Sequence, residues 1–516
     1  MLFSKNDSQQ RTSSYLTFFS QNSTKKSYNL GQLLGLILGP LCFALILIFF
    51  HPPALPEKGV FVLAITVWIA IWWITEAIPI AATSFLPLIL LPIGHVLSPE
   101  AVSSEYGNDI IFLFLGGFIL AIAMERWNLH TRVALTIIKY IGASTAKILL
   151  GFMIATGFLS MFVSNTAAVM IMIPIGLAII KEANELNDKE KHKVSLHKFE
   201  KSLVLAIGYA GTIGGLGTLI GTPPLIILKG QFEQEISFAK WMIIGIPTVF
   251  ILIALTWAYL RYVAFKHDMK YLPGGQSLIQ LKLDELGKMK YEEKVVQAIF
   301  VFASLLWISR EFLLNNWSVT SEIADGTIAI FISVLLFIIP AKNKQQFQRI
   351  IDWEVAKELP WGVLILFGGG LALAKGISES GLAKWLGLQL KSLDGVSPMI
   401  IVAVITLFVL FLTEITSNTA TATMILPILA SLSVAVDVHP LLLMVPAAMA
   451  ANCAYMLPVG TPPNAIVFGT GKLEIREMAY VGFWVNLISA VLIIIVVYFF
   501  MPIILGIDIS KALPLK

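Results

Sequence analysis

Long apolar runs dominate the pattern of hydrophobic and polar positions along this chain, and they recur from about residue 31 to residue 506. About 20 apolar residues are enough for a helix to cross a bilayer. The pattern therefore predicts an all-α polytopic membrane protein with eleven membrane-spanning helices. We place these spans at 31–50, 59–78, 80–97, 109–140, 201–232, 239–265, 295–314, 322–340, 360–390, 440–472 and 479–506.

Two further apolar segments, 147–180 and 398–436, each carry the same polar tripeptide near their middle. The first contains Ser164-Asn165-Thr166 and the second contains Ser417-Asn418-Thr419. This arrangement predicts two hairpins with polar tips. Each leg has about 17 residues, or about 25 Å of helix. Length alone leaves open whether each hairpin is re-entrant or consists of two short spans.

A Gly-Thr-Pro-Pro sequence follows each hairpin, at Gly221-Thr222-Pro223-Pro224 and at Gly460-Thr461-Pro462-Pro463. Proline lacks an N–H group and breaks a helix, which leaves carbonyl groups without intrahelical partners. Such breaks at membrane depth are tolerated when they line a cavity or are buried in protein. A matched pair of breaks in two halves of a chain points to a transporter binding site. A kinked helix with its carbonyls satisfied by neighbours is the alternative.

Three pairs of landmarks recur at a nearly constant offset, which indicates an internal duplication. The tripeptides are 253 residues apart (164 and 417), and the Gly-Thr-Pro-Pro sequences are 239 apart (221 and 460). Gly116-Gly117 and Gly368-Gly369 are 252 apart (116 and 368). We interpret Gly214-Gly215, Gly217 and Gly368-Gly369-Gly370 as sites of close helix packing.

The distribution of Lys and Arg predicts the orientation in the membrane, because cytoplasmic loops carry an excess of both. Basic residues gather in the N-terminal tail and in the loops near 181–201, 266–294 and 342–349, whereas the other loops are acidic or neutral. With eleven crossings, the N-terminus is cytoplasmic and the C-terminus extracellular. The two hairpins then enter from opposite sides, which predicts repeats of inverted topology.

Composition supports this class: 57% of the residues are hydrophobic and 13% are charged, which excludes an ordinary soluble domain. We expect neither a disulfide nor a thiol function from Cys42 and Cys453, and a solvated surface position for His192 and His197. Residues 1–30 are polar, and we expect a disordered cytoplasmic tail there without a cleaved signal sequence.

Each Ser-Asn-Thr tip can serve two ligands. Its hydroxyl and amide groups, together with helix N–H groups, can donate to a carboxylate, and its oxygens can bind sodium. Hydrogen bonding between packed helices is the alternative. Neither motif contains Lys or Arg, so a dianion would need bound cations.

The main ionisable residues of the spans are Glu76, Asp109, Glu125, Arg126 and Glu414. We expect Glu125 and Arg126 to pair or to lie at an interface. We expect Glu414 to tune the cation field or to support the hairpin backbone.

At these motifs the chain closely resembles the divalent anion/sodium symporter family, in particular its bacterial sodium-dependent dicarboxylate transporters. The resemblance implies a homodimer of elevator type, in which each protomer has a scaffold domain and a mobile transport domain. It also implies one sodium site at Ser160, Ser164, Asn165 and Gly221, and a second at Thr413, Thr416, Asn418 and Gly460. It implies that substrate carboxylates contact Ser164, Asn165, Thr166, Ser417, Asn418 and Thr419, with Thr222, Pro223, Thr461 and Pro462 nearby.

We therefore expect sodium-coupled uptake of C4 dicarboxylates such as succinate, fumarate and malate across the plasma membrane; a sodium-independent dicarboxylate exchanger is the alternative. An enzyme, a sensor and a nucleic-acid-binding protein are not expected, because catalytic motifs and a large soluble domain are not visible in the sequence. The expected divisions are a tail at 1–30, scaffold helices at 31–108, the first transport repeat at 109–235, scaffold helices with a cytoplasmic loop at 236–358, the second transport repeat at 359–475, and the last helix with the C-terminus at 476–516.

Overall fold

The computed structural model describes residues 28–142, 144–186, 190–232, 236–312, 323–342, 349–389 and 396–508. Within these ranges the chain is helical, and its β-structure is limited to two isolated bridges, Ser144 with Tyr271 and Pro340 with Arg349. The expected N-terminal tail lies almost entirely outside the described residues.

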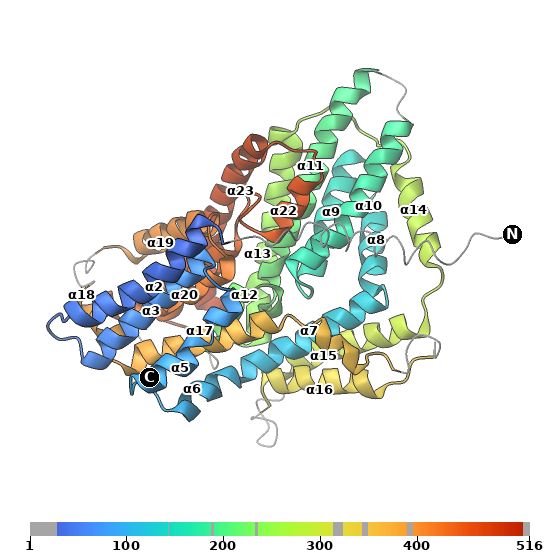
Figure 1. Cartoon of the computed structure of the whole chain (residues 1–516). Helices are drawn as coiled ribbons and strands as arrows, with labels where there is room; N and C mark the ends of the chain where they lie inside the picture. The colour runs from blue at the N-terminus through green and yellow to red at the C-terminus, as the bar shows by residue number, and fades with distance from the viewer. Residues whose placement is uncertain are drawn as a thin grey trace.

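The helices fall into a first half and a second half of the chain (Figure 1). The first half contains α2 (Leu30–Phe49), α3 (Glu57–Thr75), α4 (Ile80–Thr83), α5 (Leu86–Ile93), α6 (Pro99–Tyr106), α7 (Asp109–Arg126), α8 (Leu129–Ile141), α9 (Thr145–Ser160), α10 (Asn165–Glu185), α11 (Glu190–Gly214), α12 (Pro223–Gln231) and α13 (Phe238–Tyr259). The second half contains α14 (Gly275–Leu286), α15 (Tyr291–Phe312), α16 (Asp325–Ile338), α17 (Trp361–Glu379), α18 (Leu382–Gln389), α19 (Pro398–Thr413), α20 (Asn418–Ala435), α21 (Pro440–Asn452), α22 (Pro462–Gly469), α23 (Ile475–Ile495) and α24 (Met501–Leu505).

Seven helical segments of the described chain are long and apolar enough to cross a membrane. Six more apolar helices are shorter, and they include three of the four hairpin legs. The multi-pass helical class is thus confirmed, while the count of eleven spans plus two re-entrant hairpins stays a prediction. The long segments are Leu30–Phe49, Glu57–Thr75, Pro99–Arg126, Asn165–Glu185, Phe238–Ala264, Trp361–Glu379 and Ile475–Leu505.

A run of seven helices occurs twice in the same order, which extends the duplication beyond the three sequence landmarks. Helices α7 to α13 correspond to α17 to α23. The starts of α7 and α17 are 252 residues apart (109 and 361), and those of α10 and α20 are 253 apart (165 and 418). The offset falls to 239 at α12 and α22 (223 and 462), mainly because α21 has 13 residues where α11 has 25.

Two of the expected spans are broken at a left-handed residue, and these two breaks occupy matching places in the repeats. The span expected at 109–140 is interrupted at Trp127-Asn128, where Asn128 has a φ of 57°. The span expected at 360–390 is interrupted at Ser380-Gly381, where Gly381 has a φ of 79°. A left-handed residue ends a helix, and hydropathy alone does not register such a turn. The expectation of one unbroken helix in each range was therefore wrong.

The short helices that follow the Gly-Thr-Pro-Pro breaks each pack against the other half of the chain. Helix α12 contacts α20 and α21, and α22 contacts α10 and α11. Figure 1 shows α9, α10 and α11 on the right and α19 and α20 on the left, with α12 between them. This exchange brings the two hairpin tips to a common centre.

Close glycine contacts join the repeats to the surrounding helices, and the contact of Gly368 is of the kind predicted for it. A Cβ atom on Gly116 of α7 would lie 2.5 Å from the carbonyl of Ala329 in α16. A Cβ atom on Gly368 of α17 would lie 2.3 Å from the ring of Tyr106, the last residue of α6. These contacts cross the expected boundaries between scaffold and transport segments, and that division stays a prediction.

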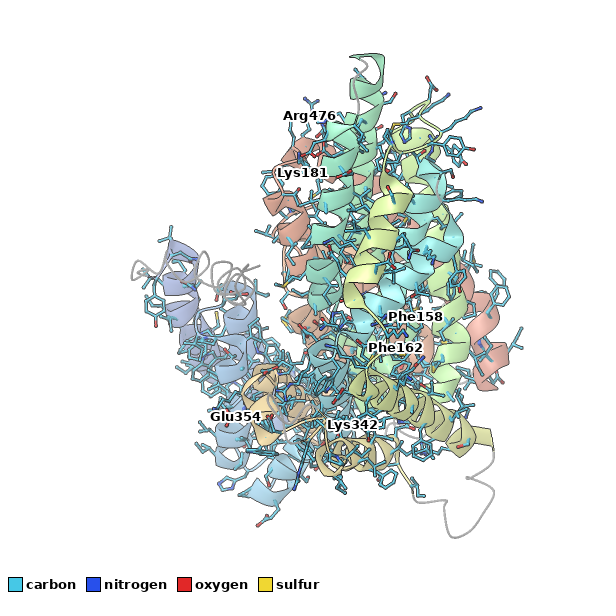
Figure 2. The ribbon with its side chains drawn as sticks, turned by 90° about the vertical axis from the view of Figure 1, so that its right-hand side faces the viewer. Phe158, Phe162, Lys181, Lys342, Glu354 and Arg476 are labelled. Carbon is cyan, nitrogen blue, oxygen red and sulfur yellow. The ribbon has the colours of Figure 1, made fainter. Side chains whose placement is uncertain are left out.

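Aromatic packing connects the first hairpin tip with α15. Phe158 and Phe162 lie near each other at the end of α9 (Figure 2), with ring centroids 5.7 Å apart. Phe162 meets Phe300 of α15 edge-on at 4.7 Å. The tip is therefore held in place on its outer side by apolar contacts, which leaves its polar side facing the centre of the molecule.

Candidate functional site

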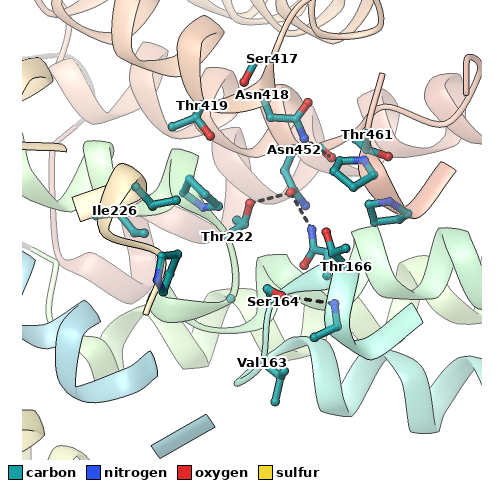
Figure 3. A pocket seen from close by; sticks show the side chains of 18 of the residues that line it. Val163, Ser164, Thr166, Thr222, Ile226, Ser417, Asn418, Thr419, Asn452 and Thr461 are labelled. Carbon is teal, nitrogen blue, oxygen red and sulfur yellow. Dashed lines mark hydrogen bonds between the residues drawn. The ribbon is translucent and has the colours of Figure 1, made fainter. Parts of the chain in front are cut away.

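The first hairpin tip is formed by the end of α9 and the start of α10. Ser164 is the N-terminal cap of α10, and its hydroxyl accepts a hydrogen bond from the N–H of Ala167 at 3.2 Å (Figure 3). Ser, Thr, Asn and Asp are preferred caps because they satisfy one of the free N–H groups of the first turn. The second tip differs, because Ser417 caps α20 without a side-chain bond to the helix. The Ser417 hydroxyl is therefore not engaged in capping.

Behind the first tip, oxygens from three segments form a compact cluster. The hydroxyl of Ser160 lies 2.7 Å from Asn165 Oδ1 and 2.5 Å from the carbonyl of Gly211. The same Asn165 oxygen lies 3.2 Å from the carbonyls of Gly211 and Gly221. With the Asn165 oxygen turned toward the cluster, one hydroxyl proton cannot serve all of these acceptors. A cluster with more acceptors than protons fits a hard cation such as sodium, for which carbonyl groups freed at helix breaks are suitable ligands.

The second tip has the matching cluster. Thr413 Oγ1 lies 2.6 Å from Asn418 Oδ1 and 2.8 Å from the carbonyl of Ala451. Each half thus supplies a hydroxyl from the end of the first hairpin leg, an asparagine from the tip, and a carbonyl near the end of the following helix. The two clusters share one construction, as a duplicated chain predicts.

The structure brings most of the predicted sodium ligands together, with three exceptions in detail. The Ser164 hydroxyl caps α10 instead of pointing to the cluster. Thr416 directs its hydroxyl to Leu412 O at 2.8 Å and to Thr421 Oγ1 at 2.6 Å. Gly460 lies beside the backbone carbonyl of Glu414. Ser160, Asn165 and Gly221 lie together in the first cluster, and Thr413 lies beside Asn418 in the second; sodium binding by these residues stays a prediction.

A pocket of about 920 Å³ separates the two tips (Figure 3). Among the described residues that line it, none is Lys, Arg or His, and the three acidic ones are Glu76, Glu125 and Glu358. Apolar side chains, including Phe114, Phe118 and Ile226, form much of the remaining wall. All ten predicted substrate-binding residues line this pocket: Ser164, Asn165, Thr166, Thr222, Pro223, Ser417, Asn418, Thr419, Thr461 and Pro462.

Four helix N-termini converge on the pocket, at the starts of α10, α12, α20 and α22. The N-terminus of a helix carries free N–H groups and a partial positive charge, and it favours an anion. Proline at the first position of α12 and of α22 suits these starts, because that N–H has no intrahelical partner. The pocket therefore attracts anions through backbone dipoles, in the absence of cationic side chains among its described lining residues.

Glu414 supports the broken segment that follows α21. Its carboxylate accepts hydrogen bonds from the backbone N–H groups of Tyr455 at 2.7 Å, Met456 at 3.0 Å and Leu457 at 3.2 Å, and from Asn486 Nδ2 at 2.7 Å. Of the two expectations for Glu414, backbone support is the one that the geometry favours. The supported backbone is the break at 453–461, which runs beside the hairpin. Arg126 pairs with Asp352 at 3.2 Å and with Glu358 at 3.6 Å, and the expected interface position of Glu125 and Arg126 stays a prediction.

Sequence reasoning missed two residues of the site. Asn452, at the end of α21, lines the pocket and bonds to Thr222 and Asn165. It is a polar residue at the end of a long apolar run, and this signal could have identified it. Gly215 was assigned to helix packing alone, yet a Cβ atom there would lie 2.6 Å from Asn165 Oδ1.

Comparisons with known proteins agree with this geometry. The family model for the transmembrane region of sodium:sulfate symporters matches residues 31–507. The chain therefore belongs to the divalent anion/sodium symporter family, a class of membrane transporters, and it is not an enzyme. It is 79% identical over 506 residues to the sodium-dependent dicarboxylate transporter SdcS of Staphylococcus aureus strain MRSA252, covering 97% of each chain. It is 78% identical over the same length to SdcS of strain MSSA476, again covering 97% of each chain.

Two solved structures share the fold at low sequence identity. The YdaH transporter of Alcanivorax borkumensis aligns with a TM-score of 0.56 at 11% identity, covering 86% of this chain and 98% of that one. MtrF of Neisseria gonorrhoeae, described as one of a class of antimetabolite efflux pumps, aligns with a TM-score of 0.53 at 12% identity, covering 93% of this chain and 97% of that one. At this identity the likeness concerns the fold alone.

Replacing Gly215 with alanine should impair the first oxygen cluster. The new methyl group would lie 2.6 Å from Asn165 Oδ1 and 3.1 Å from the Gly221 carbonyl, so Asn165 must move. We expect the sodium concentration for half-maximal uptake to rise about tenfold or more, which corresponds to about 1.4 kcal/mol. Gly469→Ala is the matched control, because a Cβ atom there meets nothing within 4 Å. Equal sodium curves for both variants would contradict the assignment.

Replacing Glu414 with glutamine should destabilise the second half of the site. The amide NH₂ would face backbone N–H groups that now donate to a carboxylate, at an expected penalty of about 2 kcal/mol. Thermal unfolding of the purified protein in detergent should show a midpoint lower by several degrees. Glu354→Gln, at an exposed pair with Lys357, should leave the midpoint unchanged. An unchanged midpoint for Glu414→Gln would show that this carboxylate is dispensable.

Proposed function

We propose that this protein is a sodium-coupled symporter that takes up C4 dicarboxylates, such as succinate, fumarate and malate, across the plasma membrane. The observation that carries the proposal is the pair of matching oxygen clusters on either side of one pocket without cationic side chains among its described lining residues. Sodium as the co-transported ion accords with membership of a sodium symporter family. The relatives are named sodium-dependent dicarboxylate transporters, and this name supports the substrate class.

The two-fold construction of the site suits a ligand with an anionic group at each end. In this proposal one carboxylate meets Ser164, Asn165 and Thr166, and the other meets Ser417, Asn418 and Thr419. Thr222, Pro223, Thr461 and Pro462, at the starts of α12 and α22, complete the surroundings of the substrate. Both ends meet a helix N-terminus, as a carboxylate requires in a site of this kind.

Charge sets a lower limit on the number of sodium ions. A dianion carried through a low-dielectric barrier without neutralisation faces a penalty of several kcal/mol or more. The pocket adds no cationic side chain among its described lining residues, and its acidic residues add negative charge to that of the dianion. At least two sodium ions are therefore needed, one for each oxygen cluster.

The proposal extends to orientation and assembly. With the basic loops in the cytoplasm and the N-terminus inside, the end of α3 and the start of α17 lie on the cytoplasmic side. Glu76 and Glu358, which flank the pocket, belong to these ends. The conformation is then inward-facing. A homodimer with a fixed scaffold domain and a moving transport domain, as the family resemblance implies, is the mechanism that we propose.

Replacing sodium with choline in the external buffer should abolish concentrative uptake of labelled succinate into proteoliposomes. The physical reason is that an unneutralised dianion cannot cross with the carrier. The alternative function, a sodium-independent dicarboxylate exchanger, predicts undiminished uptake when the liposomes are preloaded with succinate. Counterflow that survives without sodium would favour the exchanger and reject sodium coupling.

Asn165→Ala and Asn418→Ala should each abolish sodium-driven succinate uptake. Each change removes an oxygen from one cluster and a donor from the same tip. Expression and dimer content should stay near those of the parent, because neither substitution removes an apolar contact of the core. Size-exclusion chromatography of the purified variants checks this point. Parental transport by either variant would overturn the site assignment.

A further inference from the structure

Asn452 is a buried amide that contacts both halves of the repeat at the centre of the site. It is the last residue of α21, and its residue exposure is 0%. Its Nδ2 group donates to the carbonyl of Thr212 at 2.6 Å. Its Oδ1 atom accepts from Thr222 Oγ1 at 2.6 Å (Figure 3) and from Asn165 Nδ2 at 3.3 Å. One side chain of the second half thus bonds to three residues of the first half.

This bridging amide breaks the two-fold symmetry of the site. The carbonyls of Gly211 and Ala451 accept from the equivalent hydroxyls of Ser160 and Thr413, so these two positions correspond. The next residues, Thr212 and Asn452, therefore correspond as well. Only the second half places an asparagine here, and it reaches across to its own counterpart. An asymmetric residue at the meeting point of two matched clusters needs a reason of its own.

The side-chain amide of Asn165 has two possible orientations, which differ by a half-turn. In the first, Oδ1 faces the cluster beside Ser160 and the amide NH₂ donates to Asn452. In the second, the NH₂ group would face the cluster and donate to Ser160 Oγ, Gly211 O and Gly221 O, at 2.7, 3.2 and 3.2 Å. The first orientation presents an oxygen to a cation. The second fills the cluster with protons and excludes a cation.

Asn452 favours the first orientation, in which Asn165 Oδ1 also lies 3.2 Å from the carbonyl oxygens of Gly211 and Gly221, contacts that a bound cation relieves. In the second orientation Asn165 Oδ1 would lie 3.3 Å from Asn452 Oδ1, and two carbonyl oxygens repel each other. Asn452 cannot relieve this contact by turning its own amide, because its oxygen would then lie 2.6 Å from the Thr212 carbonyl, which is an acceptor only. The Thr212 carbonyl therefore fixes Asn452, and Asn452 biases Asn165 toward the orientation with its oxygen in the cluster.

The second cluster receives the same support from the main chain. Asn418 Nδ2 lies 3.5 Å from the backbone carbonyl of Asn452, and Asn418 Oδ1 faces Thr413. One residue thus holds the tip asparagines of both halves, the first through its side chain and the second through its backbone. A substitution of the Asn452 side chain removes only the first of these supports.

We propose that Asn452 is a positioning residue for the first sodium site, where it holds Asn165 in the orientation that accepts a cation. This inference rests on the proposed function of sodium-coupled transport. Without this amide, Asn165 can turn its NH₂ group into the cluster when sodium is absent, and sodium binding must then reverse that turn. Preorganisation of this kind raises affinity without a direct contact between the positioning residue and the ion.

The test is a sodium titration of succinate uptake by Asn452→Ala proteoliposomes, compared with the parent. The sodium concentration for half-maximal uptake should rise about five- to tenfold, the equivalent of about one hydrogen bond. The KM for succinate at saturating sodium should stay within about twofold of the parent value, because the pocket contacts of both tips are restored once sodium is bound. Thr406→Val, which removes a buried hydroxyl bonded to Val402 O in α19, is the control and should leave both values unchanged.

A second readout does not depend on transport. Sodium, relative to choline, should raise the unfolding temperature of the purified parent, and Asn452→Ala should need a correspondingly higher sodium concentration for the same rise. Asn452→Ser replaces Asn452→Ala if the latter does not fold. If neither variant unfolds cooperatively, the residue is structural and the inference fails.

The outcomes separate this inference from the proposed function. Parent uptake that does not require sodium rejects the proposed function itself. A sodium-dependent parent whose curve coincides with that of Asn452→Ala rejects the positioning role alone. A rise in the succinate KM at saturating sodium as large as the rise in the half-maximal sodium concentration also rejects the positioning role, because that result indicates general damage to the pocket.

Discussion

The constraint on which this structure depends is that backbone broken in apolar surroundings must find new partners. A freed N–H or C=O group without a partner costs several kcal/mol in hydrocarbon. Two such breaks, at 215–222 and at 453–461, border the site. In the second, the Glu414 carboxylate accepts from three successive N–H groups. In the break at 215–222, the Gly221 carbonyl faces the side chain of Asn165, and Gly215 leaves the space between them open because it has no side chain. Specific polar partners therefore stabilise the backbone of both breaks, and the backbone groups that remain free form the site.

Duplication makes this arrangement possible, and the exchange of short helices makes it compact. Because α12 packs on the second hairpin and α22 on the first, each tip faces the helix start of the other half. A single copy could offer one oxygen cluster and two helix N-termini. Two copies offer two clusters and four N-termini around one pocket. Perfect symmetry ends at Asn452 and Thr212, where the halves meet and one amide occupies the space between them.

The sequence predicted the helical membrane class, the duplication and the ten residues that line the pocket. These succeeded because each rests on a local signal: apolar length, a repeated tripeptide or a repeated Gly-Thr-Pro-Pro. The turns at Asn128 and Gly381 were missed, because a left-handed residue between two apolar helices leaves the hydropathy pattern unchanged. Gly215 and Asn452 were missed for a different reason. Their roles depend on what lies opposite them in space, at Asn165 and Thr212, and chain spacing does not give that information.

Charge balance explains why ion and substrate would move together under the proposed function. Each oxygen cluster has fewer protons than acceptors, so it holds a cation well and is poorly satisfied without one. With two cations and no anion, the pocket would carry two uncompensated positive charges, offset in part by the acidic residues that line it. With a dianion and no cations, four helix N-termini would face two full negative charges without any ion at the clusters. Only the complete set brings the local charge near zero, and only a near-neutral carrier crosses a low-dielectric barrier at low cost. Coupling then follows from electrostatics in one pocket, without a separate gate for each ligand.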